Sequence, residues 1–198
     1  MRSAGPDDAL IVIDLQRKYA ADDGPFAMAG ASELVARTAD FADAMRERGV
    51  PVIWVTRELR PGLSMGPATA STLGESWFSG PQAELDDRLR PRPGDVRVVK
   101  PRQSSFYGTD LDVVLRTAGV TRVLLTGVTT NICVQATAQD ARARDYDVVV
   151  LEDLTASLPV VAAGHEMSDH DVQKATLATI AHAIGTVVSS QDLLVATA

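Results

Sequence analysis

Short apolar runs recur along the chain, and most are followed by a stretch with the spacing of an amphipathic helix. Continuous apolar runs rich in β-branched residues are typical of strands buried in a parallel sheet. We expect six such strands, at residues 9–13, 52–56, 95–100, 123–126, 147–151 and 186–189. Because strands and helices alternate, the pattern predicts an α/β fold: a doubly wound, mostly parallel six-stranded sheet with helices on both faces.

The stretches between the strands repeat apolar residues every three to four positions, which predicts helices. The expected helices span residues 31–48, 110–117, 132–144 and 168–184. Ser32 and Thr109 are suited to begin the first two, because a hydroxyl can accept a hydrogen bond from an unpaired N–H of the first turn. Gly49 and Gly119 then end these two helices.

Residues 57–94 have no strong periodicity and contain many of the glycines and prolines, with a short helix expected only at residues 81–89. A segment of this length is often a lid or a binding loop. Trp77 and Phe78 within it would cover a substrate or a partner subunit, or would pack on the domain as ordinary loop aromatics.

The composition fits one globular domain, residues 1–198, with 45% hydrophobic residues. A formal net charge of -7 and a pI of about 4.9 disfavour nucleic acids and anionic membrane surfaces as partners. Cys133 is the only cysteine, so no intrachain disulfide can form, which is consistent with a reducing cytoplasm. Since no apolar run has the length of a membrane-spanning helix, we expect a cytoplasmic protein.

Three chemically useful side chains follow expected strands: Asp14, Lys100 and Cys133. Each has an ordinary explanation, because aspartate is common in turns, lysine is usually solvated and a lone cysteine is often just a small buried residue. The carboxyl ends of neighbouring parallel strands, however, share one ligand-binding crevice. If the three side chains meet there, the carboxylate can take the thiol proton while the lysine and the helix N-terminus favour a thiolate. Backbone N–H groups of Thr129 and Cys133 are then candidates for holding an oxyanion.

Several segments, in this order, are similar to the isochorismatase-like cysteine hydrolases. They are residues 11–16 (IVIDLQ), 99–102 (VKPR), 105–111 (SFYGTDL), 126–134 (TGVTTNICV), 140–141 (DA) and 150–153 (VLED). The resemblance implies a catalytic triad of Asp14, Lys100 and Cys133, and a cis peptide bond between Val128 and Thr129. It also implies a homodimer or homotetramer.

The departures from the family pattern narrow the expected chemistry. Nicotinamidases, which resemble this chain, have an Asp/His metal site between their first two strands, whereas His165, His170 and His182 all follow the fifth expected strand. We therefore expect no metal and no cofactor. The compact turn before Cys133 is more like that of the members that cleave amides and carbamoyl groups, such as ureidoacrylate, carbamoylsarcosine, biuret and streptothricin-type lactam hydrolases.

The resulting hypothesis is a metal-independent cysteine hydrolase that cleaves a C–N bond of a small amide, carbamoyl, ureido or lactam compound through an acyl-enzyme. The alternatives are an isochorismatase-type hydrolase of a vinyl ether, in which Asp14 is the general acid, and a non-catalytic family member that binds a ligand. The expected pocket wall mixes polar and aromatic side chains. Its candidates are Gln16, Tyr19, Trp77, Phe106 and Asn131.

Overall fold

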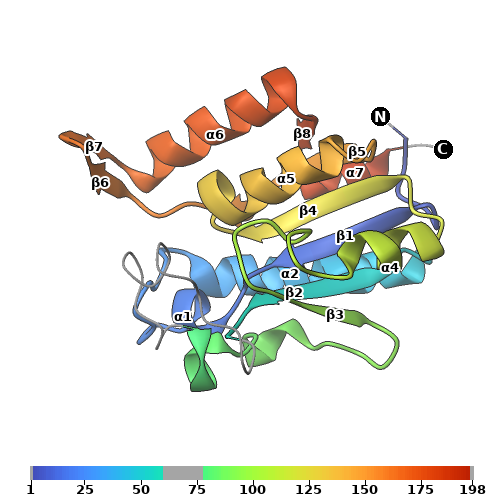
Figure 1. Ribbon diagram of the computed structural model, residues 1–198, viewed down its shortest axis with the longest axis horizontal. Helices are drawn as coiled ribbons and strands as arrows, with labels where there is room; N and C mark the ends of the chain where they lie inside the picture. Colours follow the sequence, from blue (N-terminus) through green and yellow to red (C-terminus); the bar gives the residue numbers. More distant parts are fainter. Residues whose placement is uncertain (1, 60–77, 197–198) are drawn as a thin grey trace.

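A parallel six-stranded sheet forms the centre of the protein, in the order β3-β2-β1-β4-β5-β8 (Figure 1). The computed structural model describes residues 2–59 and 78–196. The strands of this sheet are β1 (Asp8–Ile13), β2 (Val52–Arg57), β3 (Val96–Lys100), β4 (Arg122–Val128), β5 (Asp147–Ala156) and β8 (Thr186–Val188). The predicted fold class is confirmed, and only β5 extends well beyond its expected end.

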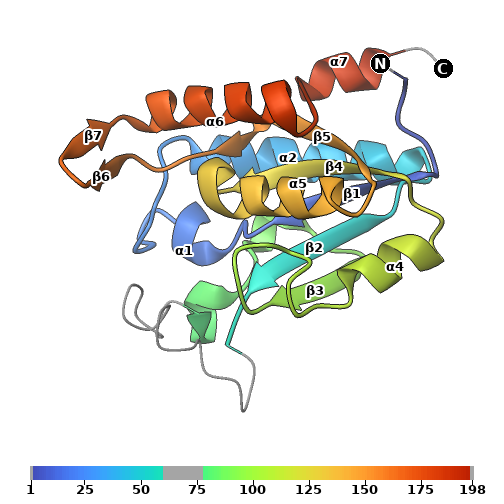
Figure 2. The same ribbon diagram turned by 45° about the horizontal axis from the view of Figure 1, so that its top comes forward.

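Helices cover both faces of the sheet, as Figures 1 and 2 show. On one face lie α1 (Arg17–Ala20), α2 (Ala31–Glu47) and α7 (Ser190–Val195). On the other face lie α4 (Leu111–Thr117), α5 (Gln135–Arg142) and α6 (Asp169–Ala183). The sheet therefore separates two hydrophobic cores, one beneath each helical layer.

Alternation along β1 shows how one strand serves both cores. Leu10 and Val12 pack with α2, whereas Ile11 and Ile13 pack with α4 and α5. All six residues of β1 are buried, as are all residues of β2 and β4. Burial on both faces explains why these strands appear in the sequence as continuous apolar runs instead of alternating ones.

The helix boundaries agree with expectation except in two places. The residue before α2 is Gly30, in a left-handed conformation, and not Ser32, whose hydroxyl accepts a hydrogen bond from Arg88 at 2.7 Å. The expected helix at 132–144 is divided into a π-helical turn, η4 (Thr130–Val134), and α5. Thr109 does accept a hydrogen bond from the Leu111 N–H, at 3.3 Å, as the sequence suggests.

Besides the short helices α1 and α7, two small features lie outside the sequence prediction. An antiparallel hairpin of β6 (Val160–Ala162) and β7 (His165–Met167) extends from the body of the molecule (Figure 2). In place of the short helix expected at 81–89 are two 3-10 turns, η2 (Gly80–Ala83) and η3 (Asp87–Leu89). These segments are too short for hydrophobic periodicity to reveal them.

Close packing of β1 against β4 shapes the carboxyl edge of the sheet. Gly127 of β4 has a φ of 111°, and a Cβ atom at this position would collide with the carbonyl oxygen of Ile13. Immediately beyond Ile13 the chain turns through Asp14, whose φ of 53° is a left-handed conformation that aspartate tolerates better than most residues. The glycine thus allows β4 to lie directly beside the turn that carries Asp14.

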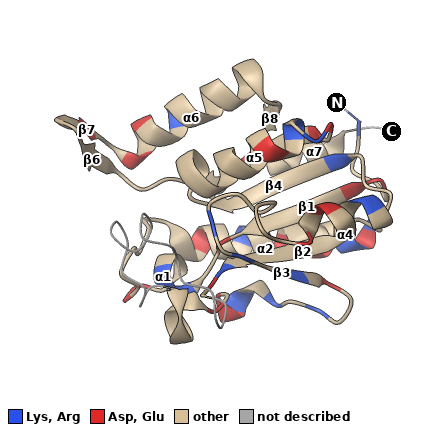
Figure 3. Ribbon diagram, viewed as in Figure 1, with Lys and Arg blue, Asp and Glu red and all other residues tan. Residues whose placement is uncertain are grey.

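Charges of both signs are interspersed over the elements (Figure 3), so the net charge of -7 is not gathered in one region. Among the residues that the structure describes, none of the helices has both the length and the apolar character that crossing a membrane requires.

Candidate active site

Asp14, Lys100 and Cys133 come together at the carboxyl edge of the sheet. The Lys100 ammonium lies 2.8 Å from Asp14 Oδ2 and 3.2 Å from Cys133 Sγ. It also donates hydrogen bonds to the carbonyls of Arg102 and Gln103, at 3.1 and 2.9 Å. The side chains of Lys100 and Asp14 are 0% and 2% exposed, and Cys133 is 4% exposed. The lysine therefore bridges a carboxylate and a thiol in an environment shielded from water.

The strand order explains why a lysine occupies the bridging position. Lys100 ends β3, and β2 separates β3 from β1, which Asp14 follows. Two strand spacings amount to about 10 Å, so only a long side chain can cross the end of β2 to reach the carboxylate. An ammonium group on a flexible stem can then donate in several directions at once.

Cys133 lies inside η4, not at the start of a regular helix as expected. Burial raises the pKa of its thiol from 9.0 to about 11, with the Lys100 charge lowering it and the Asp14 charge raising it. Desolvation therefore opposes the thiolate that the sequence favours, and the Lys100 charge offsets part of that effect. The resting nucleophile is a protonated thiol beside a carboxylate that can accept its proton.

The turn between β4 and Cys133 supplies further polar groups. The Val128–Thr129 peptide bond is cis, and the Thr129 carbonyl accepts hydrogen bonds from the N–H groups of Ile132 and Val134, each at 3.2 Å. Thr130 Oγ1, Asn131 Oδ1 and Asp14 Oδ1 are all buried without a hydrogen-bond partner in the described structure. Buried polar atoms are normally paired, so these unpaired acceptors indicate a place where a ligand binds.

The expected pocket residues separate into two groups. Asn131 lies in the same turn as Cys133. Tyr19 on α1 is also near the triad: burial raises the pKa of its phenol above the usual range, and the charges of Cys133 and Asp14 add to the shift. Trp77 falls outside the described residues.

Gln16 and Phe106 serve the fold instead of a pocket wall. Gln16 is fully buried, its Nε2 donates to the carbonyls of Arg57 and Ala83, and its Oε1 accepts from the Arg57 N–H at 3.1 Å. Phe106 is 5% exposed and stacks on Tyr146 in the core under α4 and α5, with ring centroids 6.0 Å apart. Both were expected to contact substrate, but their polar and apolar surfaces are already occupied by protein.

Sequence reasoning missed two buried cations beside the triad, Lys18 and Arg57, although it did single out Phe78, which contacts both. Lys18 on α1 is 1% exposed, and burial lowers the pKa of its ammonium to about 8. Arg57 at the end of β2 is 5% exposed, and the Phe78 ring contacts both cations, with its centroid 4.6 Å from Lys18 Nζ and from Arg57 Cζ. Arg57 carried a usable signal, because it ends a buried strand at the same sheet edge as Asp14. Lys18 carried none, since its burial depends on how α1 packs.

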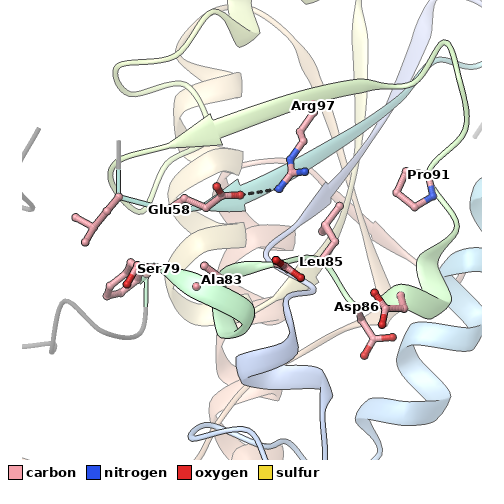
Figure 4. A pocket seen from close by; sticks show the side chains of 12 residues that line it. Glu58, Ser79, Ala83, Leu85, Asp86, Pro91 and Arg97 are labelled. Carbon is pink, nitrogen blue, oxygen red and sulfur yellow. Dashed lines mark hydrogen bonds and ion pairs between the residues drawn. The ribbon is translucent and has the colours of Figure 1, made fainter. Parts of the chain in front are cut away.

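A separate groove of about 620 Å³ lies beside the ends of β2 and β3, and Figure 4 shows the side chains that line it. Three of its acidic side chains, Glu58, Asp86 and Asp87, form ion pairs with arginines. Glu58 pairs with Arg97 at 2.8 Å, and Asp86 pairs with Arg88 at 2.7 Å. None of the triad residues lines this groove, so it is distinct from the candidate active site.

In the part of the chain that the structure describes, no three His, Cys, Asp or Glu side chains form a group that could hold a metal ion. His165, His170 and His182 are exposed, whereas the triad residues are buried.

Comparison with known proteins identifies the family. The model of the isochorismatase domain matches residues 8–192. The chain belongs to the isochorismatase family. Among its relatives is the ureidoacrylate amidohydrolase RutB of Methylobacterium radiotolerans, 34% identical over 194 residues that span 86% of this chain and 72% of the relative. The ureidoacrylate amidohydrolase RutB of Pantoea ananatis is 32% identical over 91% of this chain and 78% of its own length.

Solved structures of isochorismatase-like proteins share the whole architecture. A cysteine hydrolase from Pseudomonas syringae pv. phaseolicola superposes with a TM-score of 0.91 at 28% identity, covering 96% of this chain and 91% of its own. N-carbamoylsarcosine amidase from Thermoplasma acidophilum gives a TM-score of 0.75, also at 28% identity, over 96% of this chain and 97% of its own. The similarity therefore extends to members of the family named for hydrolysis of C–N bonds.

Proposed function

We propose that this protein is a metal-independent cysteine hydrolase that cleaves a C–N bond of a small amide, carbamoyl, ureido or lactam compound. The observation that carries the proposal is the position of the Lys100 ammonium, 2.8 Å from the Asp14 carboxylate and 3.2 Å from the Cys133 sulfur. Nucleophile, base and a cation between them are the parts that an acyl transfer needs. The names of the relatives, amidohydrolase and amidase, support the same bond type.

The first half-reaction forms an acyl-enzyme. Asp14 takes the proton of the Cys133 thiol as the sulfur attacks the substrate carbonyl carbon, because the resting thiol, with its raised pKa, is protonated. The carbonyl oxygen becomes an oxyanion, which the backbone N–H groups of Thr129 and Cys133 hold. The C–N bond then breaks, the amine leaves with the proton from Asp14, and a thioester on Cys133 remains.

The second half-reaction releases the acid. Asp14, again a carboxylate, takes a proton from a water molecule as the water oxygen attacks the thioester carbon. The C–S bond breaks, the sulfur regains the proton, and the carboxylic or carbamic acid departs. Lys100 stays charged throughout and offsets the negative charge that moves between Asp14 and Cys133.

Unpaired acceptors at the site favour a substrate with N–H donors. Asp14 Oδ1 and Asn131 Oδ1 are buried and lack partners in the described structure. An amide or carbamoyl NH₂ can donate hydrogen bonds to such acceptors, whereas a vinyl ether has no donor at the bond that is broken. This observation supports C–N cleavage over the isochorismatase reaction.

The test incubates the protein and its Cys133→Ala variant with a panel of amides, ureas, carbamoyl amino acids, lactams and isochorismate, and mass spectrometry follows the addition of water. We expect the parent alone to hydrolyse a carbamoyl or amide compound, with a transient mass increase on Cys133. Val113→Ala, which alters an exposed residue of α4, is the matched control and should retain full activity. Pyruvate release from isochorismate by both the parent and Cys133→Ala would refute the proposal in favour of the vinyl-ether reaction. Binding of a panel compound without turnover would favour the non-catalytic alternative.

We also propose that the protein is a homodimer or homotetramer in the cytoplasm. The β6–β7 hairpin, in which Val161 is 79% exposed and Met167 is 37% exposed, offers apolar surface for a second copy. Light scattering on the parent and on Val161→Glu tests this, because a monomeric parent would refute it.

A further inference from the structure

Arg57 is a buried cation without an anionic partner among the residues that the structure describes. Arg57 is 5% exposed, and its Nη2 atom has no hydrogen-bond partner in the described part of the chain. No carboxylate among the described residues lies within ion-pair distance of its guanidinium. Such a group is costly to leave unpaired in a protein interior, since both its charge and its N–H donors are removed from water.

The register of the sheet places Arg57 beside the triad. Arg57 of β2 is the direct partner of Lys100 of β3, and Val55 is the partner of Val98 two residues earlier. Paired residues in a parallel sheet project to the same face. Arg57 therefore shares its face and its sheet edge with the lysine that contacts Asp14 and Cys133.

Hydrogen bonds hold the backbone of Arg57, whereas the head group, among the described residues, contacts an aromatic ring. Gln16 hydrogen-bonds both the N–H and the carbonyl of Arg57, and Lys18 Nζ donates to the same carbonyl at 3.3 Å. The guanidinium carbon lies 4.6 Å from the centroid of Phe78, a contact that positions the planar group but uses none of its N–H donors. An arginine fixed in this way is preorganised to bind a planar anion through parallel hydrogen bonds.

We propose that Arg57 binds the carboxylate of the substrate, so that the compound this enzyme cleaves is a carbamoyl or ureido acid oriented with its acid group toward the end of β2. The part of this inference that concerns the reaction rests on the proposed C–N hydrolysis, whereas the binding of a carboxylate by Arg57 can be measured without turnover. The substrate then has two ends that match two sets of unpaired atoms. Its N–H groups meet Asp14 Oδ1 and Asn131 Oδ1, and its carboxylate meets Arg57 Nη2.

The experiment measures binding to the Cys133→Ala variant by calorimetry with two matched pairs of ligands. The pairs are N-carbamoylglycine with isobutylurea, and 3-ureidopropionate with isopentylurea, in which a branched alkyl group of similar shape replaces the carboxylate. We expect the acid of at least one pair to bind at least about 10-fold more tightly than its neutral partner, the range of a hydrogen-bonded charge pair.

Substitutions of Arg57 then assign the preference to this residue. In the Cys133→Ala background, Arg57→Gln should abolish the preference for the acid, and Arg57→Lys should retain part of it. Both keep the backbone atoms that Gln16 contacts, and thermal unfolding checks that both are folded. Arg97→Gln is the control, because Arg97 is an exposed arginine of β3 that pairs with Glu58, and it should leave the preference unchanged.

Three results would overturn the assignment of Arg57: equal binding of the acid and its neutral partner, an equal loss for both in Arg57→Gln, or no binding of either member of both pairs. Turnover by the Cys133-containing protein is scored separately. If the acid binds with dependence on Arg57 but nothing is hydrolysed, the carboxylate site stands and the proposed reaction fails. If a neutral urea is hydrolysed as well as its acid counterpart, the reaction stands and the carboxylate site fails.

Discussion

Replacing Lys100 by methionine tests whether the bridging ion pair is a structural element as well as a catalytic one. Lys100→Met keeps the length and apolar volume of the side chain but removes the charge that lies 2.8 Å from Asp14, where both side chains are no more than 2% exposed. Removing one partner of a buried pair costs about 3–5 kcal/mol, because the other charge stays buried without compensation. A domain of this size loses roughly 2–4 °C in Tm for each kcal/mol, so we expect Tm to fall by about 6–20 °C.

A double-mutant cycle makes this reasoning refutable. The free energy of unfolding is measured in urea for the parent, Lys100→Met, Asp14→Asn and the double variant. Asparagine suits the left-handed conformation of residue 14, whose φ is 53°, so its effect reports on charge and not on backbone strain. The double variant should lose at least about 2 kcal/mol less than the sum of the two single losses, because no unpaired charge remains. Additive losses, or a Lys100→Met variant as stable as the parent, would show that the two charges are not coupled in the folded protein.

Four further predictions concern the thiol, Gly127 and Gln16. Because burial raises the pKa of Cys133 to about 11, alkylation by iodoacetamide should accelerate about tenfold per pH unit from pH 7 to 10, and a plateau below pH 8 would contradict this. Between pH 9.0 and about 11 the folded state keeps the thiol proton that the unfolded chain has lost. The free energy of unfolding should therefore fall by about 1.4 kcal/mol per pH unit over this range. The reference is Cys133→Ala, which lacks the thiol. Gly127→Ala should abolish activity and lower Tm, because the added methyl group collides with the Ile13 carbonyl. Gly94→Ala is the control: a Cβ there meets nothing within 4 Å, so Tm should fall only by the smaller amount that its positive φ causes. Similar losses of activity and Tm in the two variants would count against the close packing of β1 and β4. Gln16→Leu should lower the free energy of unfolding by about 2–4 kcal/mol and reduce activity as well, since it leaves buried carbonyl and N–H groups of Arg57 and Ala83 unpaired. A fall in kcat/KM with an unchanged Tm would instead indicate that Gln16 contacts the substrate.

The sheet and the three triad positions follow from local pattern. Five of the six strands end within two residues of the expected positions, because burial on both faces produces apolar runs whose ends are marked by polar residues such as Asp14 and Lys100. That these ends share one edge is a general property of parallel sheets, whereas the meeting of the three side chains depends on the strand order, which the sequence alone left open.

What the sequence did not reveal depends on packing between distant segments. The protonation state of Cys133 reflects the competition between desolvation and a lysine two strands away, and residue type alone cannot decide such a balance. Phe106 and Gln16 were misjudged for a similar reason. An aromatic ring and an amide in loops near a sheet edge can face either the crevice or the protein, and only the positions of Tyr146 and Arg57 decide which.

The place of β3 at the border of the sheet has a consequence for how the enzyme loses activity. β3 pairs with β2 alone among the described strands, and its last residue supplies the bridging ammonium. Outer strands open more readily than central ones, through local fluctuations that leave the rest of the structure intact. Low concentrations of urea should therefore displace Lys100 and abolish activity before the fluorescence of Trp54 in β2 reports unfolding. The midpoint of inactivation should then lie at a lower urea concentration than the midpoint of unfolding.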